Sequence, residues 1–209
     1  MKKFAIGIGI LAIFIVSCTS TNEKKEETKD STENRSIAFP EDTQGISEVI
    51  TRFVRAYISQ DAEKANALIH PQLGLYIIYR PGASDRYERV DRLDFKHPIP
   101  EHFSYTRFEN DYPLTFDKLP TFDCGAETWD KLGFFCDTTS QADQLTKIAA
   151  FEHEYGETSA DELKQIEELE KDTFRVILTK DENLIFHVKK YQDKWYVLVL
   201  DRAYGWCDA

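Results

Sequence analysis

Three polar side chains beside predicted strands could bind a ligand or take part in acid–base chemistry. Tyr79 and Arg80 end one apolar run, and Asp201 ends the last such run of the chain. An arginine at a strand end can hold an anionic group with its bidentate fork, or pair with a nearby acid such as Asp85. A buried carboxylate at Asp201 would have a raised pKa suited to catalysis, or would cap the turn that begins at Ala203. Tyr79, Arg80 and Asp201 are therefore ligand-binding candidates, and no catalytic residue is assigned.

A fourth candidate, Trp129, lies between two cysteines, Cys124 and Cys136, with Phe134 and Phe135 close by. Exposed aromatic rings at this place would form a stacking surface for a carbohydrate or a protein partner. The alternative is that they pack into the core beside a disulfide. Both interpretations stay open at this point.

The cysteines themselves suggest an oxidising compartment. Cys124 and Cys136 are twelve positions apart, and a disulfide between them is plausible. Apart from Cys18 the sequence has three cysteines, which is an odd number. The third, Cys207, could instead pair with Cys124 or with Cys136. No C-x-x-C pair or nearby histidine completes a zinc site, so no metal is expected.

Known cofactor and nucleophile motifs are missing from the sequence. It has no P-loop, no G-x-S-x-G elbow and no EF-hand loop, and Gly7-Ile8-Gly9 lacks the third glycine of a dinucleotide site. No cofactor is therefore expected. Catalysis is not excluded, because catalytic triads assemble from distant residues.

The first half of the chain predicts two helices and then a strand. Apolar residues recur at helical spacing from Ile46 to Ser59, and Asp61 can cap a shorter helix that ends before His70-Pro71. Leu75–Tyr79 is typical of a strand. The charged stretch from Asp85 to Asp94 indicates a loop or irregular helix. In the proline-rich stretch that follows, Leu114 to Phe116 and Phe103 to Phe108 are the expected strand pieces.

The second half predicts two more helices and a closing meander. The first helix covers Ser140 to Tyr155, with Leu145, Ile148, Ala149 and Phe151 expected to face inward. Ser159 to Glu162 is a capping box that opens a surface helix ending near Lys171. Three strands follow: Phe174 to Thr179, Leu184 to Tyr191, and Trp195 to Asp201.

The N-terminal residues are typical of an export signal. Lys2 and Lys3 precede thirteen uncharged residues, Phe4 to Val16. These would cover only ~20 Å as a helix, which is short of the ~30 Å hydrocarbon layer of a bilayer. A transient signal at residues 1–17 is therefore expected rather than a permanent membrane span.

The segment Ile15-Val16-Ser17-Cys18 resembles the lipobox of bacterial lipoproteins. That resemblance implies cleavage before Cys18, lipid attachment to its thiol, acylation such as palmitate, and a place in the cell envelope facing the periplasm or the exterior. Two or more acyl chains hold a protein stably on a membrane. The alternative is an ordinary cleaved signal followed by a chance cysteine.

Residues 18–36 contain no aromatic or aliphatic residue after Cys18, so they are expected to form a disordered tether of the lipidated N-terminus. The remainder, residues 37–209, is predicted to be a single α+β domain. The net charge is −11, and removal of Lys2 and Lys3 makes the mature chain more acidic. Nucleic acid is therefore not an expected partner, and membrane attachment would depend on the lipid rather than on charge.

The order of elements resembles the NTF2-like superfamily, which includes SnoaL-like proteins. The resemblance depends on Ile46 to Tyr79 and Phe174 to Asp201. It implies helices packed on a curved antiparallel sheet that forms a cone, with residues 140–171 as part of an elaborated middle region. A functional pocket would open inside such a cone.

Three functions of different classes follow as hypotheses. The first is a lipid-anchored, non-catalytic binding or accessory module with a small-molecule, glycan or envelope-protein partner. The second is a hydrolase or isomerase that uses a pocket carboxylate such as Asp201 with a tyrosine. The third is a structural subunit of a larger envelope assembly. A large cavity with converging polar groups would favour a ligand or an enzyme, and a filled core with an exposed apolar patch would favour a partner protein.

Overall fold

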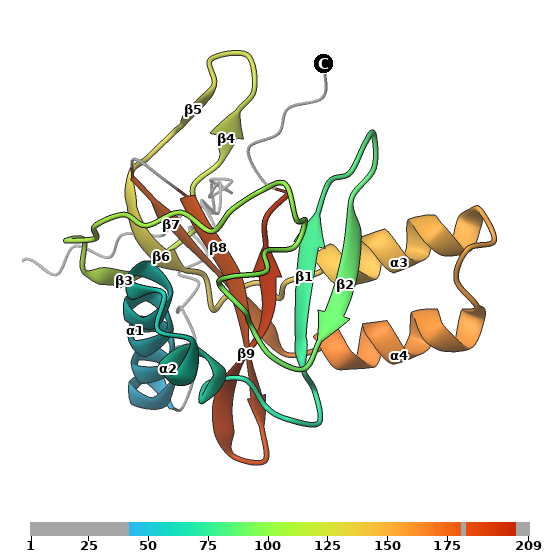
Figure 1. Ribbon diagram of the computed structural model, residues 1–209, viewed down its shortest axis with the longest axis horizontal. Helices are drawn as coiled ribbons and strands as arrows, with labels where there is room; N and C mark the ends of the chain where they lie inside the picture. Colours follow the sequence, from blue (N-terminus) through green and yellow to red (C-terminus); the bar gives the residue numbers. More distant parts are fainter. Residues whose placement is uncertain (1–41, 181–182, 204–209) are drawn as a thin grey trace, which may run out of the picture. The chain divides into compact units, whose positions relative to one another are not determined.

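The computed structural model describes residues 42–180 and 183–203. The chain divides by its contacts after Ser36, and every described residue belongs to the second part, Ile37–Ala209. The predicted signal peptide, Cys18, the tether and Cys207 lie outside the described residues. The described part is an α+β fold in which helices lie on a mostly antiparallel sheet (Figure 1), as the sequence predicted at that level.

A seven-stranded sheet forms the centre of the fold, in the order β2-β1-β9-β8-β7-β6-β3. All neighbouring strands are antiparallel except for two parallel pairs, β1 with β9 and β3 with β6. A separate hairpin is formed by β4 and β5. The strands are β1 Leu75–Tyr79, β2 Arg86–Val90, β3 Leu114–Phe116, β4 Phe122–Asp123, β5 Thr128–Trp129, β6 Gly133–Cys136, β7 Thr173–Thr179, β8 Asn183–Tyr191 and β9 Lys194–Asp201.

Helix α1 (Thr43–Ser59) covers one face of the sheet. The Asp42 side chain accepts a hydrogen bond from the Gly45 N–H at 2.9 Å and so satisfies one of the free donors at the helix start. The apolar residues of α1 recur every three or four positions and are buried, which confirms the predicted amphipathic helix. The short helix α2 (Ala62–Asn66) starts at Asp61, whose carboxylate accepts from the Lys64 N–H at 3.1 Å, also as predicted.

Helices α3 (Gln144–Glu154) and α4 (Ala160–Glu170) form an antiparallel pair whose inner ends lie against the sheet and whose outer ends extend beyond it (Figure 1). The capping box at Ser159 and Glu162 is present, as predicted. Leu145, Ile148 and Ile166 pack with Leu198 and Val199 of β9 in a core of their own. The expectation that Phe151 faces inward was wrong, because it lies beyond this core and is 47 % exposed.

Two strand expectations were also wrong. Within the stretch Asp85 to Asp94, expected as a loop or irregular helix, Arg86–Val90 forms the edge strand β2. Charged side chains suit an edge strand because they discourage pairing with other chains. Phe103 to Phe108 contains no strand, because side chains rather than a neighbouring strand bind its carbonyls: Arg202 donates to Phe103 and Ser104, and Gln60 donates to Tyr105.

Among the helices of residues 42–203, with 181–182 left out, none is long and apolar enough to cross a bilayer.

Candidate functional site

Three of the four predicted site residues lie at neighbouring backbone positions where β1 and β9 end, and the charges of Arg80, Asp85 and Asp201 lie close together there. The two strands run parallel and place Ile78 opposite Asp201, so Tyr79 and Arg80 follow directly beside the aspartate. Arg80 Nε donates to Asp85 Oδ1 at 2.6 Å, which confirms the ion-pair interpretation of this arginine. The parallel pairing therefore builds a cluster of charges at one end of the sheet.

Asp201 lies at the centre of that cluster and is 8 % exposed. One carboxylate oxygen accepts a hydrogen bond from Arg175 Nη2 at 2.6 Å, and the other accepts from the Ala203 N–H at 3.1 Å. Burial raises the pKa of Asp201, although Arg175 acts to lower it, and the nearby charge of Asp85 raises it further. Asp201 is thus both a buried carboxylate of raised pKa and the cap of the Ala203 turn.

A buried histidine continues this row of polar groups across the sheet. His187 of β8 lies opposite Arg175 of β7 and has no exposed surface. Neither ring nitrogen has a hydrogen-bond partner among the described residues. Burial and the neighbouring Arg175 hold the pKa of His187 well below its usual range. The Glu170 carboxylate, 3.6 Å from Nδ1, would favour protonation, but the loss of water around a fully buried ring outweighs it.

Glu170 links this row to the helix pair. Its two oxygens accept hydrogen bonds from the N–H groups of Leu145 at 3.0 Å and Thr146 at 2.7 Å, in the first turn of α3. The Asp143 side chain makes no capping bond there, so the last residue of α4 caps α3 in its place. Burial raises the pKa of Glu170 against the lowering effect of these donors.

Two open cavities of about 400 and 680 Å³ are found among the described residues. Glu170 lines the larger one, and neither is lined by Asp201 or His187. The smaller lies beside Arg55 and Lys180, and the larger lies between the inner ends of α3 and α4. The row of polar groups therefore connects strands and helices, and both oxygens of Asp201 are engaged.

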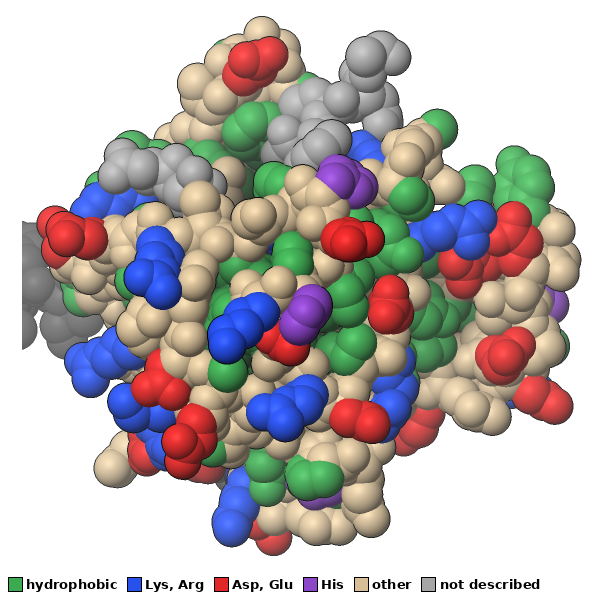
Figure 2. Space-filling model, viewed as in Figure 1, with side chains coloured by type: hydrophobic (Ala, Val, Ile, Leu, Met, Phe, Trp, Pro, Cys, Tyr) green, Lys and Arg blue, Asp and Glu red, His purple; other side chains and the backbone are tan. Residues whose placement is uncertain are grey.

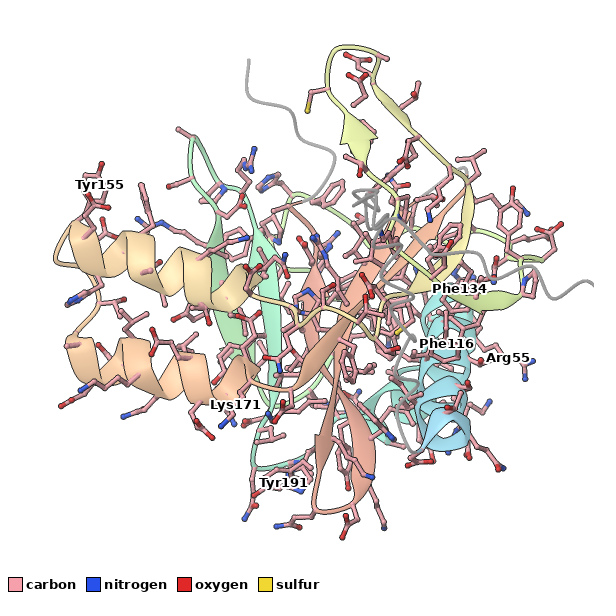
Figure 3. The ribbon with its side chains drawn as sticks, turned by 180° about the vertical axis from the view of Figure 1, so that it is seen from behind. Arg55, Phe116, Phe134, Tyr155, Lys171 and Tyr191 are labelled. Atoms are coloured by element: carbon pink, nitrogen blue, oxygen red, sulfur yellow. The ribbon has the colours of Figure 1, made fainter. Side chains whose placement is uncertain are left out.

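The space between α1 and the sheet, where a cone would hold its pocket, is filled by side chains. Phe53 of α1 contacts Phe186 of β8 with ring centroids 4.9 Å apart. Tyr57 of α1 packs edge-on against Phe95 at 5.6 Å and Tyr105 at 5.9 Å. Figure 3 shows Phe116 and Phe134 on this same side of the sheet, facing the α1 region. The aromatic rings therefore fill the space in which the pocket of a cone would lie.

Trp129, the fourth predicted site residue, lies in the β4–β5 hairpin. Its ring packs edge-on against Phe122 with centroids 5.3 Å apart, and its Nε1–H donates to Asn183 Oδ1 at 2.9 Å. The first contact holds the two strands of the hairpin together, and the second ties the hairpin to Asn183 at the start of β8. Trp129 therefore packs within its own hairpin rather than beside Tyr79 and Arg80.

The predicted disulfide between Cys124 and Cys136 was wrong. Cys136 is a free, fully buried thiol on β6, where its side chain joins the core under α1, and burial raises its pKa to about 12. Cys124 is in a disulfide, and the cysteine bonded to it lies outside the described residues. The two sites are separated because β6 is paired on both sides, while Cys124 lies at the exposed turn of the hairpin.

Sequence reasoning did not identify Arg175, Glu170 or His187 as members of this cluster. A charged residue within the apolar run of β7 was the available signal. Comparisons of the chain with protein-family models, with curated proteins and with solved structures found no match. The described residues contain no group of three metal-ligating side chains.

Arg175→Met should destabilise the fold strongly. The pair is buried, with side-chain exposures of 13 % and 4 %, and removal of the cation leaves the Asp201 charge without its partner. A loss of ~3–5 kcal/mol in the free energy of unfolding is expected from urea denaturation. Adding Asp201→Asn should recover most of it, and Arg89→Met, at an exposed ion pair, should change little. If the double variant is as unstable as the single one, the pair is not the cause.

Acid should destabilise the fold through His187. Its pKa is depressed in the folded chain, so only the unfolded chain takes up the proton as the pH falls below the ordinary value of 6.5. The free energy of unfolding should then fall by up to ~1.4 kcal/mol per pH unit. The raised pKa values of Glu170 and Asp201 have the opposite effect on stability as the pH falls. Both residues are present in the unchanged chain and in the His187→Leu variant, so a comparison of the two isolates the contribution of His187.

The His187→Leu chain should lack this part of the pH dependence. Urea denaturation of both chains between pH 7 and pH 5 measures it. Parallel curves for the two chains would show that His187 does not contribute.

Proposed function

We propose that this protein is a lipid-anchored component of a bacterial cell envelope whose α+β domain is a non-catalytic binding or accessory module. The N-terminal sequence, with its short apolar segment and the lipobox-like residues before Cys18, supports the anchor. Two helices before β1 and a central meander β7-β8-β9 support an NTF2-like arrangement with an elaborated middle.

The observation that carries the binding function is the filled interior. In an NTF2-like enzyme the pocket would open between the sheet and the helices, but here Phe53, Tyr57 and Phe186 occupy that space and are at most 6 % exposed. A ligand would have to displace this core, at a cost of several kcal/mol. Recognition therefore takes place on the outer surface, where an envelope protein or a glycan can reach.

A hydrolase or isomerase is the second candidate, and the buried carboxylate of Asp201 favours it. Each of its oxygens already accepts one hydrogen bond, from Arg175 or from the Ala203 N–H, and the residue is only 8 % exposed, so a substrate would have to disturb a buried ion pair to reach it. The binding module agrees better with this geometry.

Phe53→Ala tests the filled interior. Removal of a fully buried ring should cost ~3–5 kcal/mol and leave an apolar cavity large enough for benzene. Saturating benzene should then raise the melting temperature of this variant. It should not change the melting temperature of the unchanged chain or of Phe151→Ala, a control at an exposed position. A benzene-dependent rise in the unchanged chain would reveal a pocket and favour the enzyme.

Cys18→Ala tests the anchor. Without the thiol no lipid can be attached, so the protein should move from the membrane fraction to the soluble fraction of expressing cells. Mass spectrometry of the unchanged chain should find a modified Cys18 as its first residue, and Ser20→Ala should behave as the unchanged chain. Equal retention of Cys18→Ala in the membrane fraction would contradict lipid anchoring.

A further inference from the structure

The outer end of the α3–α4 pair carries two adjacent exposed aromatic residues. Phe151 is 47 % exposed and Tyr155, one turn later, is 66 % exposed. Their ring centroids are 4.7 Å apart. Figure 3 places Tyr155 at the tip of α3, pointing away from the sheet. The pair forms a small apolar surface, which we call the aromatic tip.

The fold does not need these rings for its own packing. Leu145, Ile148 and Ala149 already bury the inner face of α3 against the sheet. The other large exposed apolar side chains of the described part, Phe103 and Leu132, belong to different segments of the chain. Paired exposed aromatics are typical of binding surfaces, because they supply contact area with little loss of conformational freedom.

Negative charge surrounds the aromatic tip. Residues 143–171 contain nine acidic side chains and three basic ones. In Figure 2 acidic groups are spread over the region of α3 and α4, with a hydrophobic group at its outer end. The nearest cation from the sheet, Arg86, is already paired with Glu157 at 2.8 Å and Glu152 at 3.7 Å.

Other carboxylates near the tip are available to a partner. Glu154 and Asp161 are exposed, and neither has an ion-pair partner among the described residues. Aromatic rings attract cations to their faces through the ring quadrupole, and both rings are accessible to solvent. Ring faces and carboxylates thus attract the same kind of group, a cation.

We propose that the aromatic tip is a docking surface for a lysine- or arginine-rich segment of a partner protein. Cationic side chains would lie over the rings of Phe151 and Tyr155, while Glu154 and Asp161 would pair with neighbouring cations. This inference depends on the proposed binding function and gives it a place and a partner chemistry. A second copy of the chain fits poorly, because two acidic tips repel each other, and an anionic lipid surface is repelled for the same reason.

A short arginine-rich peptide serves as the probe, with the full-length chain in detergent micelles and isothermal titration calorimetry as the measurement. The unchanged chain should bind the peptide, and binding should weaken as salt is raised. The double variant Phe151→Ala/Tyr155→Ala should bind at least about fivefold more weakly. Leu132→Ala, which removes an exposed apolar side chain elsewhere, should bind as the unchanged chain does.

Three results would overturn the assignment. They are no binding of the peptide to the unchanged chain, equal binding by the double variant, and tip-dependent binding of a neutral oligosaccharide in place of the peptide. Circular dichroism and urea denaturation check that the double variant is folded, which is expected because both side chains are exposed. The fates of Cys18→Ala and Phe53→Ala do not depend on the tip, so failure here is distinguishable from failure of the proposed function.

Discussion

The burial of β8 on both faces is the constraint on which the rest of this fold depends. From Leu184 to Val188 every side chain is almost fully removed from water, whichever way it points. A strand in that position needs cover on each side. Helix α1 supplies it on one face with Phe53 against Phe186, and on the other face Glu170 at the end of α4 lies 3.6 Å from His187. Both helix layers are therefore required by the same strand.

The same constraint explains why the polar groups of this region come in fixed pairs. A charge that loses water must be neutralised by a partner or by the gain or loss of a proton. Arg175 and Asp201 form such a pair, and Glu170 is held by two N–H groups of α3. The Glu170 carboxylate lies 3.6 Å from His187 Nδ1, too far for a hydrogen bond, and burial holds the pKa of His187 well below its usual range. The ionisable residues at the end of β1 and β9 are thus arranged to hold the sheet and the helices together.

Local pattern was enough to predict much of the fold. Helical spacing predicted α1, the capping box predicted the start of α4, and the residue types of the last three runs predicted β7, β8 and β9. Wrong predictions arose where a distant residue determines the local structure. Arg86–Val90 becomes a strand only because β1 lies beside it, and Phe103–Phe108 is held in an irregular course by Arg202. Cys136 could not be recognised as a core thiol until β6 was placed between β3 and β7.

The sequence was enough to predict the candidate site residues at the strand ends, but not the residues that contact them. Arg80 and Asp201 stood out as polar residues after apolar runs, whereas Arg175, Glu170 and His187 meet them only through the strand register and the return of α4. The part of the molecule least explained by packing is the outer end of the α3–α4 pair. Its inner residues are required to cover the sheet, but Phe151 and Tyr155 bury no core and lie in acidic surroundings that favour water. These two side chains contribute little to stability, and solubility alone would favour polar residues at their positions. Contact with another molecule is the simplest reason for their presence.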